Sequence, residues 1–113
     1  MAELRVDGDE VVLELSGLEK VGALHGDVRV ARSSVREVRA VDDAMAEVRG
    51  LRAPGTGFPG VIALGTWRRR GGKDFVAVRR HAPGVVVELE GAPYRRLIVT
   101  TSDPSAIETA VSR

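Results

Sequence analysis

Cysteine is absent from the 113-residue sequence, and histidine occurs only twice, as His25 and His81. The lack of cysteine excludes disulfide bonds, thiolate chemistry and cysteine-ligated zinc. No serine lies in a Gly-x-Ser-x-Gly motif, so a hydrolase triad has no anchor. The two histidines and the scattered carboxylates do not assemble into a catalytic cluster. We therefore expect a protein that is not an enzyme and that holds no cofactor or metal.

Long apolar runs are also missing. No stretch approaches the roughly 20 apolar residues that a membrane-spanning helix needs, and the N-terminus lacks the basic and then apolar pattern of a signal peptide. These absences predict a cytoplasmic protein that does not span a membrane, while weak contact with a membrane surface stays open. The net charge of +1 gives no global electrostatic reason to bind nucleic acid.

The composition that remains is that of one ordinary globular domain over residues 1–113, with 43% apolar and 29% charged residues. The charge is divided unevenly along the chain. Residues 1–50 carry 7 basic and 11 acidic side chains, whereas residues 51–113 carry 10 basic and 5 acidic ones. A basic face in the second half, association of unlike faces and a mixed solvated surface are all compatible with this division.

Short runs rich in β-branched residues, separated by turn signals, predict about seven to eight strands. The runs cover residues 4–6, 11–15, 27–30, 35–41, 61–67, 74–78, 85–90 and 94–100. The Asp-Gly pair between the first two runs is a strong hairpin signal. Many short strands with dense turns are typical of a β barrel or sandwich, so we expect a mainly β (α+β) fold.

Helix signals occur in three places. Ser16 and Glu19 have the spacing of a capping box, which predicts a short helix over residues 17–24. A second short helix is predicted over residues 43–49, between an acidic start and a glycine end. Asp103-Pro104 supplies an N-cap and a proline at the first helical position, which predicts one C-terminal helix.

Residues 55–60 read Gly-Thr-Gly-Phe-Pro-Gly, the GxGxxG spacing of loops that cradle dinucleotide phosphates. Such a loop follows a strand and opens a helix, whose N-terminal amides meet the pyrophosphate. Here the motif follows a predicted helix and precedes a predicted strand, and Pro59 removes one amide. We therefore interpret residues 53–60 as a loop that redirects the chain and either buries Phe58 or presents it at an interface.

The stretches 18–28, 49–57, 60–66 and 71–75 resemble a group of small uncharacterised actinobacterial proteins with a bacterial pleckstrin-homology-like (PH-like) domain. The resemblance implies a strongly bent antiparallel barrel or sandwich capped by one C-terminal helix, and it implies no activity. Family members that bind phosphoinositides carry Lys and Arg in the first hairpin loop. Residues 7–10 of this chain are Asp-Gly-Asp-Glu instead, and these carboxylates argue against a lipid headgroup at that loop.

The strongest binding candidates are Arg68, Arg69, Arg70 and Lys73, which lie on a predicted hairpin turn over residues 68–73. Four cations on a tight turn suit a phosphate or an acidic partner, because charge-assisted hydrogen bonds are strong. The plainer interpretation is a solvated hairpin tip that protects the sheet edge from pairing.

Two functions follow from these features. The preferred one is a non-enzymatic PH-like interaction domain that binds a protein partner or associates with itself through a sheet edge or the loop 53–60. Phe58 and Trp67 are its interface candidates. The alternative is a module that binds an anionic ligand, a phosphate or a lipid headgroup, through the basic hairpin 68–73, which Arg79-Arg80 would then join.

Overall fold

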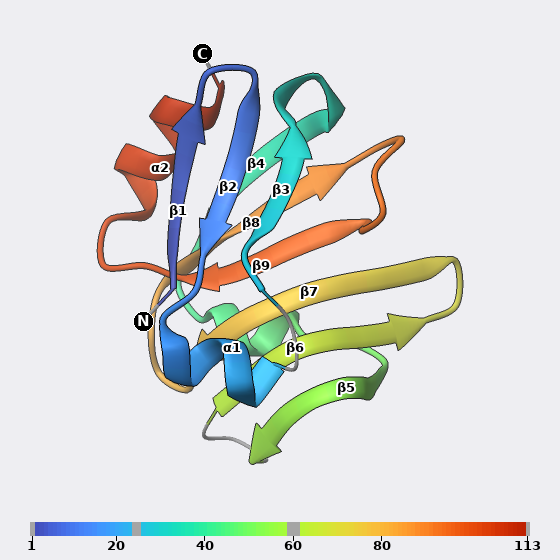
Figure 1. Cartoon of the computed structure of the whole chain (residues 1–113). Coiled ribbons are helices and arrows are strands. Elements are labelled where there is room, and N and C mark those ends of the chain that lie inside the picture. The colour runs from blue at the N-terminus through green and yellow to red at the C-terminus, as the bar shows by residue number, and fades with distance from the viewer. Residues whose placement is uncertain (1, 24–25, 59–61, 113) are drawn as a thin grey trace.

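The structure, a computed structural model, describes residues 2–23, 26–58 and 62–112, and within these it describes no side chain at residues 21, 22, 51–58 and 112. In this part of the chain nine strands form two sheets, and a helix ends the described chain (Figure 1). The mainly β architecture predicted from the sequence is confirmed. The strands of the two sheets cross steeply, as in an orthogonal sandwich, and the described strands do not close into a barrel.

The three-stranded sheet consists of β1 (Glu3–Asp7), β2 (Glu10–Glu14) and β3 (Val28–Ala31). The six-stranded sheet consists of β4 (Val35–Val41), β5 (Leu51–Phe58), β6 (Ile62–Arg69), β7 (Gly72–Arg79), β8 (Gly84–Leu89) and β9 (Arg96–Thr100). The helices are α1 (Gly17–Ala23), α2 (Pro104–Ser112) and two short 3-10 helices, η1 (Arg32–Ser34) and η2 (Ala44–Glu47). Within the described residues, no helix has the length and apolar character needed to cross a membrane.

The strand β9 lies between β8 and β7, because the six-stranded sheet has the spatial order β4-β8-β9-β7-β6-β5. It pairs antiparallel with β8 and parallel with β7, from Asp74 opposite Arg96 to Ala77 opposite Val99. The other pairs among the described strands are antiparallel. The expectation of a wholly antiparallel arrangement is therefore wrong at one pair, since the chain after β8 returns into the space beside β7.

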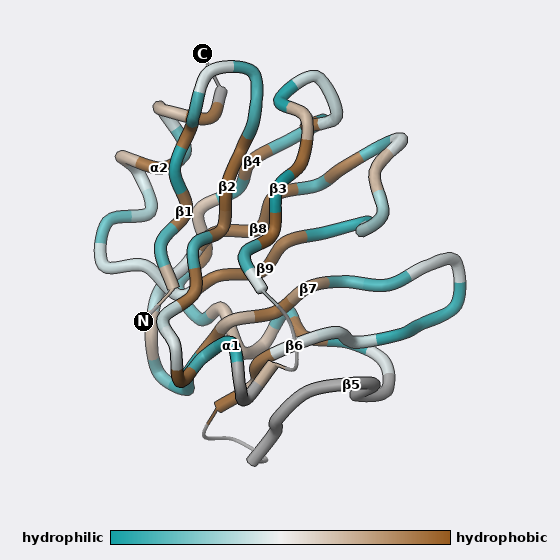
Figure 2. The backbone as a smooth tube through the Cα atoms, in the orientation of Figure 1, coloured by the Kyte–Doolittle hydropathy of each residue, from teal (hydrophilic) through white to brown (hydrophobic). Residues whose placement is uncertain are grey.

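The main hydrophobic core fills the space between the two sheets. Side chains on the inner faces of the sheets are completely buried there, among them Leu13, Phe75, Val87 and Leu97. The helix α2 closes this layer by packing on β4 and β1, with Val111 in the core. Figure 2 shows hydrophobic residues along the middle of the strands and hydrophilic ones towards the free end of the β6–β7 hairpin.

A second, smaller core covers the outer face of the six-stranded sheet. Trp67, Val76 and Ile98 are buried there, and η2 packs on them through Ala44, which is completely buried. Side chains alternate between the two faces of a strand, so Trp67 and Phe75 lie on opposite faces of neighbouring strands.

The predicted caps of the first and the last helix are formed, whereas Asp43 makes no side-chain capping bond at the start of η2. Ser16 Oγ accepts a hydrogen bond from the Glu19 N–H at 3.2 Å, and Glu19 Oε1 accepts one from the Ser16 N–H at 2.9 Å. These reciprocal bonds are the capping box that begins α1. Asp103 Oδ1 accepts from the Ala106 N–H at 3.2 Å, and Pro104 is the first residue of α2.

The segment 53–60 is not the loop that the sequence suggested. Residues 51–58 form β5, an edge strand of the six-stranded sheet, and the last two residues of the GxGxxG motif lie outside the described residues. The register of β5 against β6 shifts between Arg52 and Gly55. Pro54 falls within this shift on an edge strand, which is where a strand tolerates a residue without an N–H. The next described element after β5 is the strand β6, so the described chain places no helix after the motif.

Two further expectations need correction. The predicted helix over residues 43–49 is the shorter 3-10 helix η2, whose Val48 N–H donates to the Met45 carbonyl at 3.2 Å. A single turn suffices there, because the chain must enter β5 within a few residues. The nine described strands exceed the predicted count of about seven to eight because the sequence patterns of β5 were interpreted as a loop.

Candidate functional site

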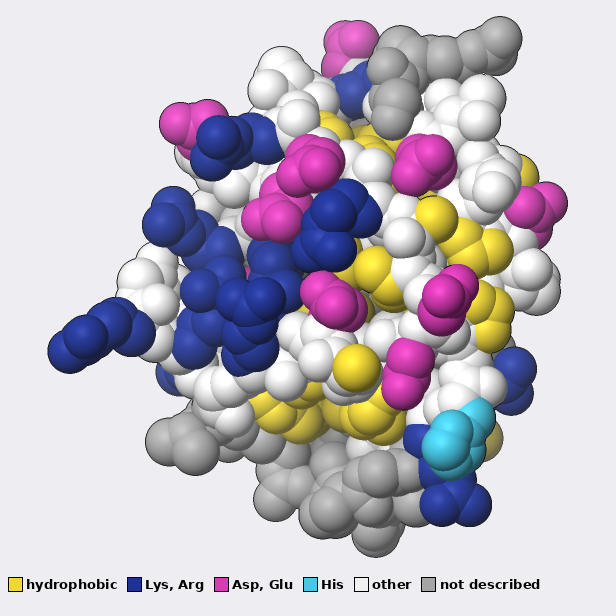
Figure 3. Space-filling model, turned by 180° about the vertical axis from the view of Figure 1, so that it is seen from behind, with side chains coloured by type: hydrophobic (Ala, Val, Ile, Leu, Met, Phe, Trp, Pro, Cys, Tyr) yellow, Lys and Arg dark blue, Asp and Glu magenta, His cyan; other side chains and the backbone are white. Residues whose placement is uncertain are grey.

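A pocket of about 530 Å³ opens where the β6–β7 hairpin meets the turn between β8 and β9. We call it the cationic pocket; it is lined by Arg68, Arg69, Gly71, Gly72, Lys73, Ala92, Pro93 and Arg95. Figure 3 shows lysine and arginine side chains gathered at the side of the outer face from which the hairpin projects. Three of the four predicted cations therefore share a pocket with Arg95.

Cross-strand register places two of these cations directly opposite each other. Arg68 on β6 pairs with Lys73 on β7, so their Cβ atoms lie about 4.5–5.5 Å apart on one face of the hairpin. Like charges at such positions repel each other and destabilise the pair. The Lys73 ammonium lies over the Tyr94 ring, 5.1 Å from its centroid, and this cation–π contact offsets part of the repulsion.

The turn between β8 and β9 is held to the hairpin by one backbone hydrogen bond and to β8 by another. The Arg95 N–H donates to the Lys73 carbonyl at 2.8 Å, and the Leu89 N–H donates to the Arg95 carbonyl at 2.9 Å. The aliphatic part of the Arg95 side chain lies across Gly72, where an added Cβ would come within 2.4 Å of Arg95 Cγ. Because Gly72 has no side chain, Arg95 can occupy the space beside it.

Behind the cationic pocket, the completely buried carboxylate of Asp74 holds two guanidinium groups. Arg96, which is 2% exposed, donates to Asp74 Oδ2 from Nη2 at 2.7 Å and from Nε at 3.0 Å. Arg69 donates from Nε to Oδ2 at 3.0 Å and from Nη2 to Oδ1 at 3.4 Å. Asp74 thus fixes Arg69 on the pocket wall, and its negative charge is already shared between two cations.

The Arg96 guanidinium connects the buried carboxylate to η2. Its Nη2 donates to the Glu47 carbonyl at 3.0 Å, and the Glu47 carboxylate accepts from Arg39 Nη2 at 3.2 Å. The Nη1 of Arg96 is buried without a hydrogen-bond partner among the described residues, and Glu47 Oε1 lies 4.0 Å from it. Unsatisfied donors are costly in a low-dielectric interior, so this network depends strongly on Asp74.

Three cations that line the cationic pocket, together with Arg70 in the adjacent turn, are without an acidic partner among the described residues. Arg68, Arg70, Lys73 and Arg95 form no ion pair with any residue in the described part of the chain. On the three-stranded sheet, by contrast, cations are paired with neighbouring carboxylates, as in the 3.2 Å contact between Arg29 and Glu10. The pocket therefore concentrates uncompensated positive charge and can attract an anion.

Tyr94, the single tyrosine of the chain, is buried beside the cationic pocket. Its ring meets that of Phe75 edge-on, with the centroids 5.6 Å apart. Burial raises the pKa of the Tyr94 phenol above its ordinary value, while a hydrogen bond with Thr66 and the charge of Arg68 act to lower it. The folded pKa lies above the unfolded one, so the associated stability is present below about pH 10 and is lost as the pH rises further.

Replacement of Arg68 with serine should raise the pKa of Tyr94 further, because the cation that favours the phenolate is removed. Ultraviolet titration of the single tyrosine measures this pKa directly. Arg79→Ser removes the same charge at the far end of β7 and should leave the pKa unchanged. A lower tyrosine pKa in the Arg68 variant would contradict the position of its guanidinium beside the phenol.

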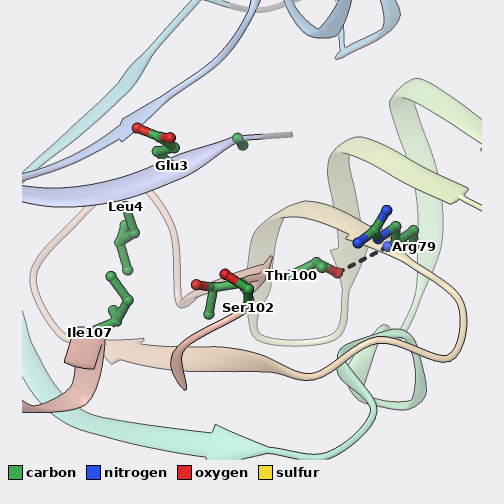
Figure 4. A pocket seen from close by; sticks show the side chains of 8 residues that line it. Glu3, Leu4, Arg79, Thr100, Ser102 and Ile107 are labelled. Atoms are coloured by element: carbon green, nitrogen blue, oxygen red, sulfur yellow. Dashed lines mark hydrogen bonds between the residues drawn. The ribbon is translucent and has the colours of Figure 1, made fainter. Parts of the chain in front are cut away.

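A second pocket, of about 450 Å³, lies at the opposite end of β7 (Figure 4). It is lined by Ala2, Glu3, Leu4, Arg79, Thr100, Thr101, Ser102 and Ile107. Figure 4 shows Leu4 and Ile107 pointing toward each other, and the Arg79 N–H donates to the Thr100 hydroxyl at 3.1 Å. Arg79 is the one cation among its lining residues, so this pocket lacks the concentration of like charge that distinguishes the cationic pocket.

The other residues singled out in the sequence are dispersed. Arg70 is exposed in the turn between β6 and β7, whereas Trp67 is 8% exposed on the outer face, opposite Asp74. The side chain of Phe58 lies outside the described residues. Arg79-Arg80 lies at the far end of β7 from the hairpin turn, so the expectation that it joins the basic hairpin is wrong.

Arg95 is the pocket residue that the sequence analysis missed. It lies in a Pro-Tyr-Arg-Arg string before β9, and no spacing or motif distinguishes it from any other exposed arginine. The insertion of β9 beside β7 brings it to residues 68–73. The strand order of the sheet therefore places Arg95 in the pocket, and the residues around Arg95 in the sequence do not reveal that order.

Comparison of the chain with protein-family models, with curated proteins and with solved structures found no match. Among the residues that the structure describes, no group of three or more histidine or acidic side chains is placed to hold a metal ion.

Proposed function

We propose that the chain is a binding module for an anionic ligand whose phosphate groups occupy the cationic pocket. One observation carries the proposal: Arg68, Lys73 and Arg95 line one pocket, and none of them pairs with a carboxylate of the described residues. Their mutual repulsion is unfavourable in the free protein. A bound anion removes this repulsion and adds charge-assisted hydrogen bonds.

Phosphate is the chemistry that these side chains recognise best. A guanidinium presents a planar fork of N–H donors that matches two phosphate oxygens, and a lysine adds a compact charge. The charged residues that line the pocket are all donors, because the carboxylate of Asp74 is buried behind Arg69. A free phosphorylated molecule and a lipid headgroup offer this same chemistry, so both need to be tested.

The test compares sodium phosphate with anionic phospholipid vesicles as probes, followed through the fluorescence of Trp67, the single tryptophan. The double variant Arg68→Ser/Arg95→Ser should bind at least about tenfold more weakly, and binding should weaken with added salt. Arg79→Ser/Arg80→Ser removes the same charge at the opposite end of β7 and should retain binding. If both double variants lose affinity equally, net charge alone attracts anions and the proposal fails.

The broader description is a non-enzymatic interaction domain with a PH-like fold, and it stays a proposal. Two stacked sheets followed by a C-terminal helix are compatible with that fold, although the parallel β7–β9 pair departs from its antiparallel order. A protein partner or a second copy would present acidic groups to the cationic pocket. Pairing through the β4 edge is disfavoured, because the Ala40 N–H already donates to the Glu108 carboxylate at 3.1 Å.

A further inference from the structure

We infer that the ligand of the cationic pocket carries two linked phosphate groups, as a diphosphate or a polyphosphate chain does. The inference rests on the proposed function, because it names the ligand class of the same pocket. Charge is the first argument. Arg68, Lys73 and Arg95 supply three positive charges to the pocket with no acidic partner among the described residues. One phosphate monoester carries about −1.5 to −2 at pH 7 and leaves about one of these charges uncompensated, whereas two linked phosphates neutralise the set.

The distribution of these cations is the second argument. Arg68 and Lys73 lie on the hairpin side of the cationic pocket, and Arg95 lies on the side of the β8–β9 turn. Gly71 and Gly72, which carry no side chains, also line the pocket. The volume of about 530 Å³ falls in the range of sites that enclose small molecules, roughly 300–1,000 Å³. A diphosphate ligand can place one phosphate on each side of the pocket, with the bridging oxygen between them. It then contacts the cations of both sides.

The absence of acceptors among the charged lining residues is the third argument. The nearest carboxylate of the network, Asp74, is completely buried and already accepts from Arg69 and Arg96. Phosphate oxygens without a proton are therefore favoured over protonated ones. Since the second pKa of a phosphate ester is about 6, affinity should rise between about pH 5 and about pH 7.5 as the ligand loses its proton.

Gly72 offers a test of this geometry that changes no charge. A methyl group at residue 72 would meet Arg95 Cγ at 2.4 Å and Cδ at 3.2 Å, so the arginine must move away. At Gly8, in the turn between β1 and β2 and outside the pocket lining, the same added atom meets nothing within 4 Å. Both glycines have positive φ, +151° at Gly72 and +59° at Gly8, so both alanine variants carry backbone strain, and Gly72→Ala alone displaces Arg95.

Isothermal titration with sodium pyrophosphate and with sodium phosphate, at one pH and one ionic strength, tests the inference. The wild-type chain should bind pyrophosphate at least about tenfold more tightly than phosphate. Gly72→Ala and Arg95→Ser should each reduce this preference to about threefold or less, whereas Gly8→Ala, remote from the pocket, should retain it. Circular dichroism of each variant establishes that the sheets are intact.

The possible results separate the inference from the proposed function. Equal affinities of the wild-type chain for pyrophosphate and phosphate would overturn the two-phosphate ligand and leave the anion-binding function standing. A preference that survives both Gly72→Ala and Arg95→Ser would also overturn it. Binding of neither anion and of no anionic phospholipid vesicle would remove both proposals. Binding restricted to anionic phospholipid vesicles would assign the pocket to a membrane surface and overturn the inference.

Discussion

Replacement of Asp74 with alanine should lower the free energy of unfolding by about 3–5 kcal/mol. Asp74 is completely buried and neutralises Arg96, which is itself 2% exposed, through hydrogen bonds of 2.7 and 3.0 Å. Without the carboxylate, Arg96 remains as a buried charge whose Nη1 already has no hydrogen-bond partner among the described residues. The Glu47 carboxylate, 4.0 Å away, is too distant and too exposed to replace Asp74.

Urea denaturation followed through Trp67 fluorescence measures this loss, and a paired variant serves as its control. Asp74→Leu combined with Arg96→Met should recover much of the stability, because apolar residues of similar volume often replace a buried ion pair without loss. A decrease below about 1 kcal/mol for Asp74→Ala would contradict a buried, uncompensated Arg96. A double variant as unstable as the single one would show that packing rather than charge dominates the site.

Replacement of Phe75 with alanine should lower the free energy of unfolding by a similar amount, about 3–5 kcal/mol. The ring is completely buried in the core between the sheets, so its removal loses the transfer free energy and leaves a cavity. It also removes the edge-on contact with the Tyr94 ring, whose centroid lies 5.6 Å away. Aromatic pairs of this geometry add about 0.5–1.5 kcal/mol beyond the buried area.

The same variant has a spectroscopic consequence in the cationic pocket. Burial is the main cause that raises the pKa of Tyr94, so looser packing at Phe75 should bring that pKa back toward its ordinary value. Phe75→Leu keeps a large apolar side chain and should show a smaller change in both stability and pKa. A large loss of stability with an unchanged tyrosine pKa would mean that the Phe75 ring does not support Tyr94.

Features that depend on a few neighbouring residues could be predicted from the sequence. The capping box of Ser16 and Glu19, the N-cap at Asp103 and the first hairpin all form as expected. Each of these signals satisfies backbone groups within a single turn, so the sequence contains both partners. The basic hairpin was predicted for the same reason, since its cations are adjacent in the chain.

Features that depend on distant partners could not be predicted. The pairing of Asp74 with Arg96 joins residues 22 positions apart, and each looks like an ordinary surface charge in the sequence. Residues 51–58 contain glycine and proline and a single β-branched residue, Thr56, and they form a strand because β6 offers them an edge. Arg95 joins the cationic pocket through the topology of β9 alone.

The insertion of β9 between β7 and β8 also determines when the cationic pocket can exist during folding. The β6–β7 hairpin closes a short turn and can form early, whereas β9 must pair with β8 on one side and, in parallel orientation, with β7 on the other, where Asp74 lies opposite Arg96. Such non-local pairings are slow, because loop-closure entropy opposes them until they are complete. The two sides of the pocket therefore meet only when β9 is paired with β7. A ligand bound there stabilises the native chain over states that lack this pairing, so anion binding reports on the insertion of β9 into the sheet.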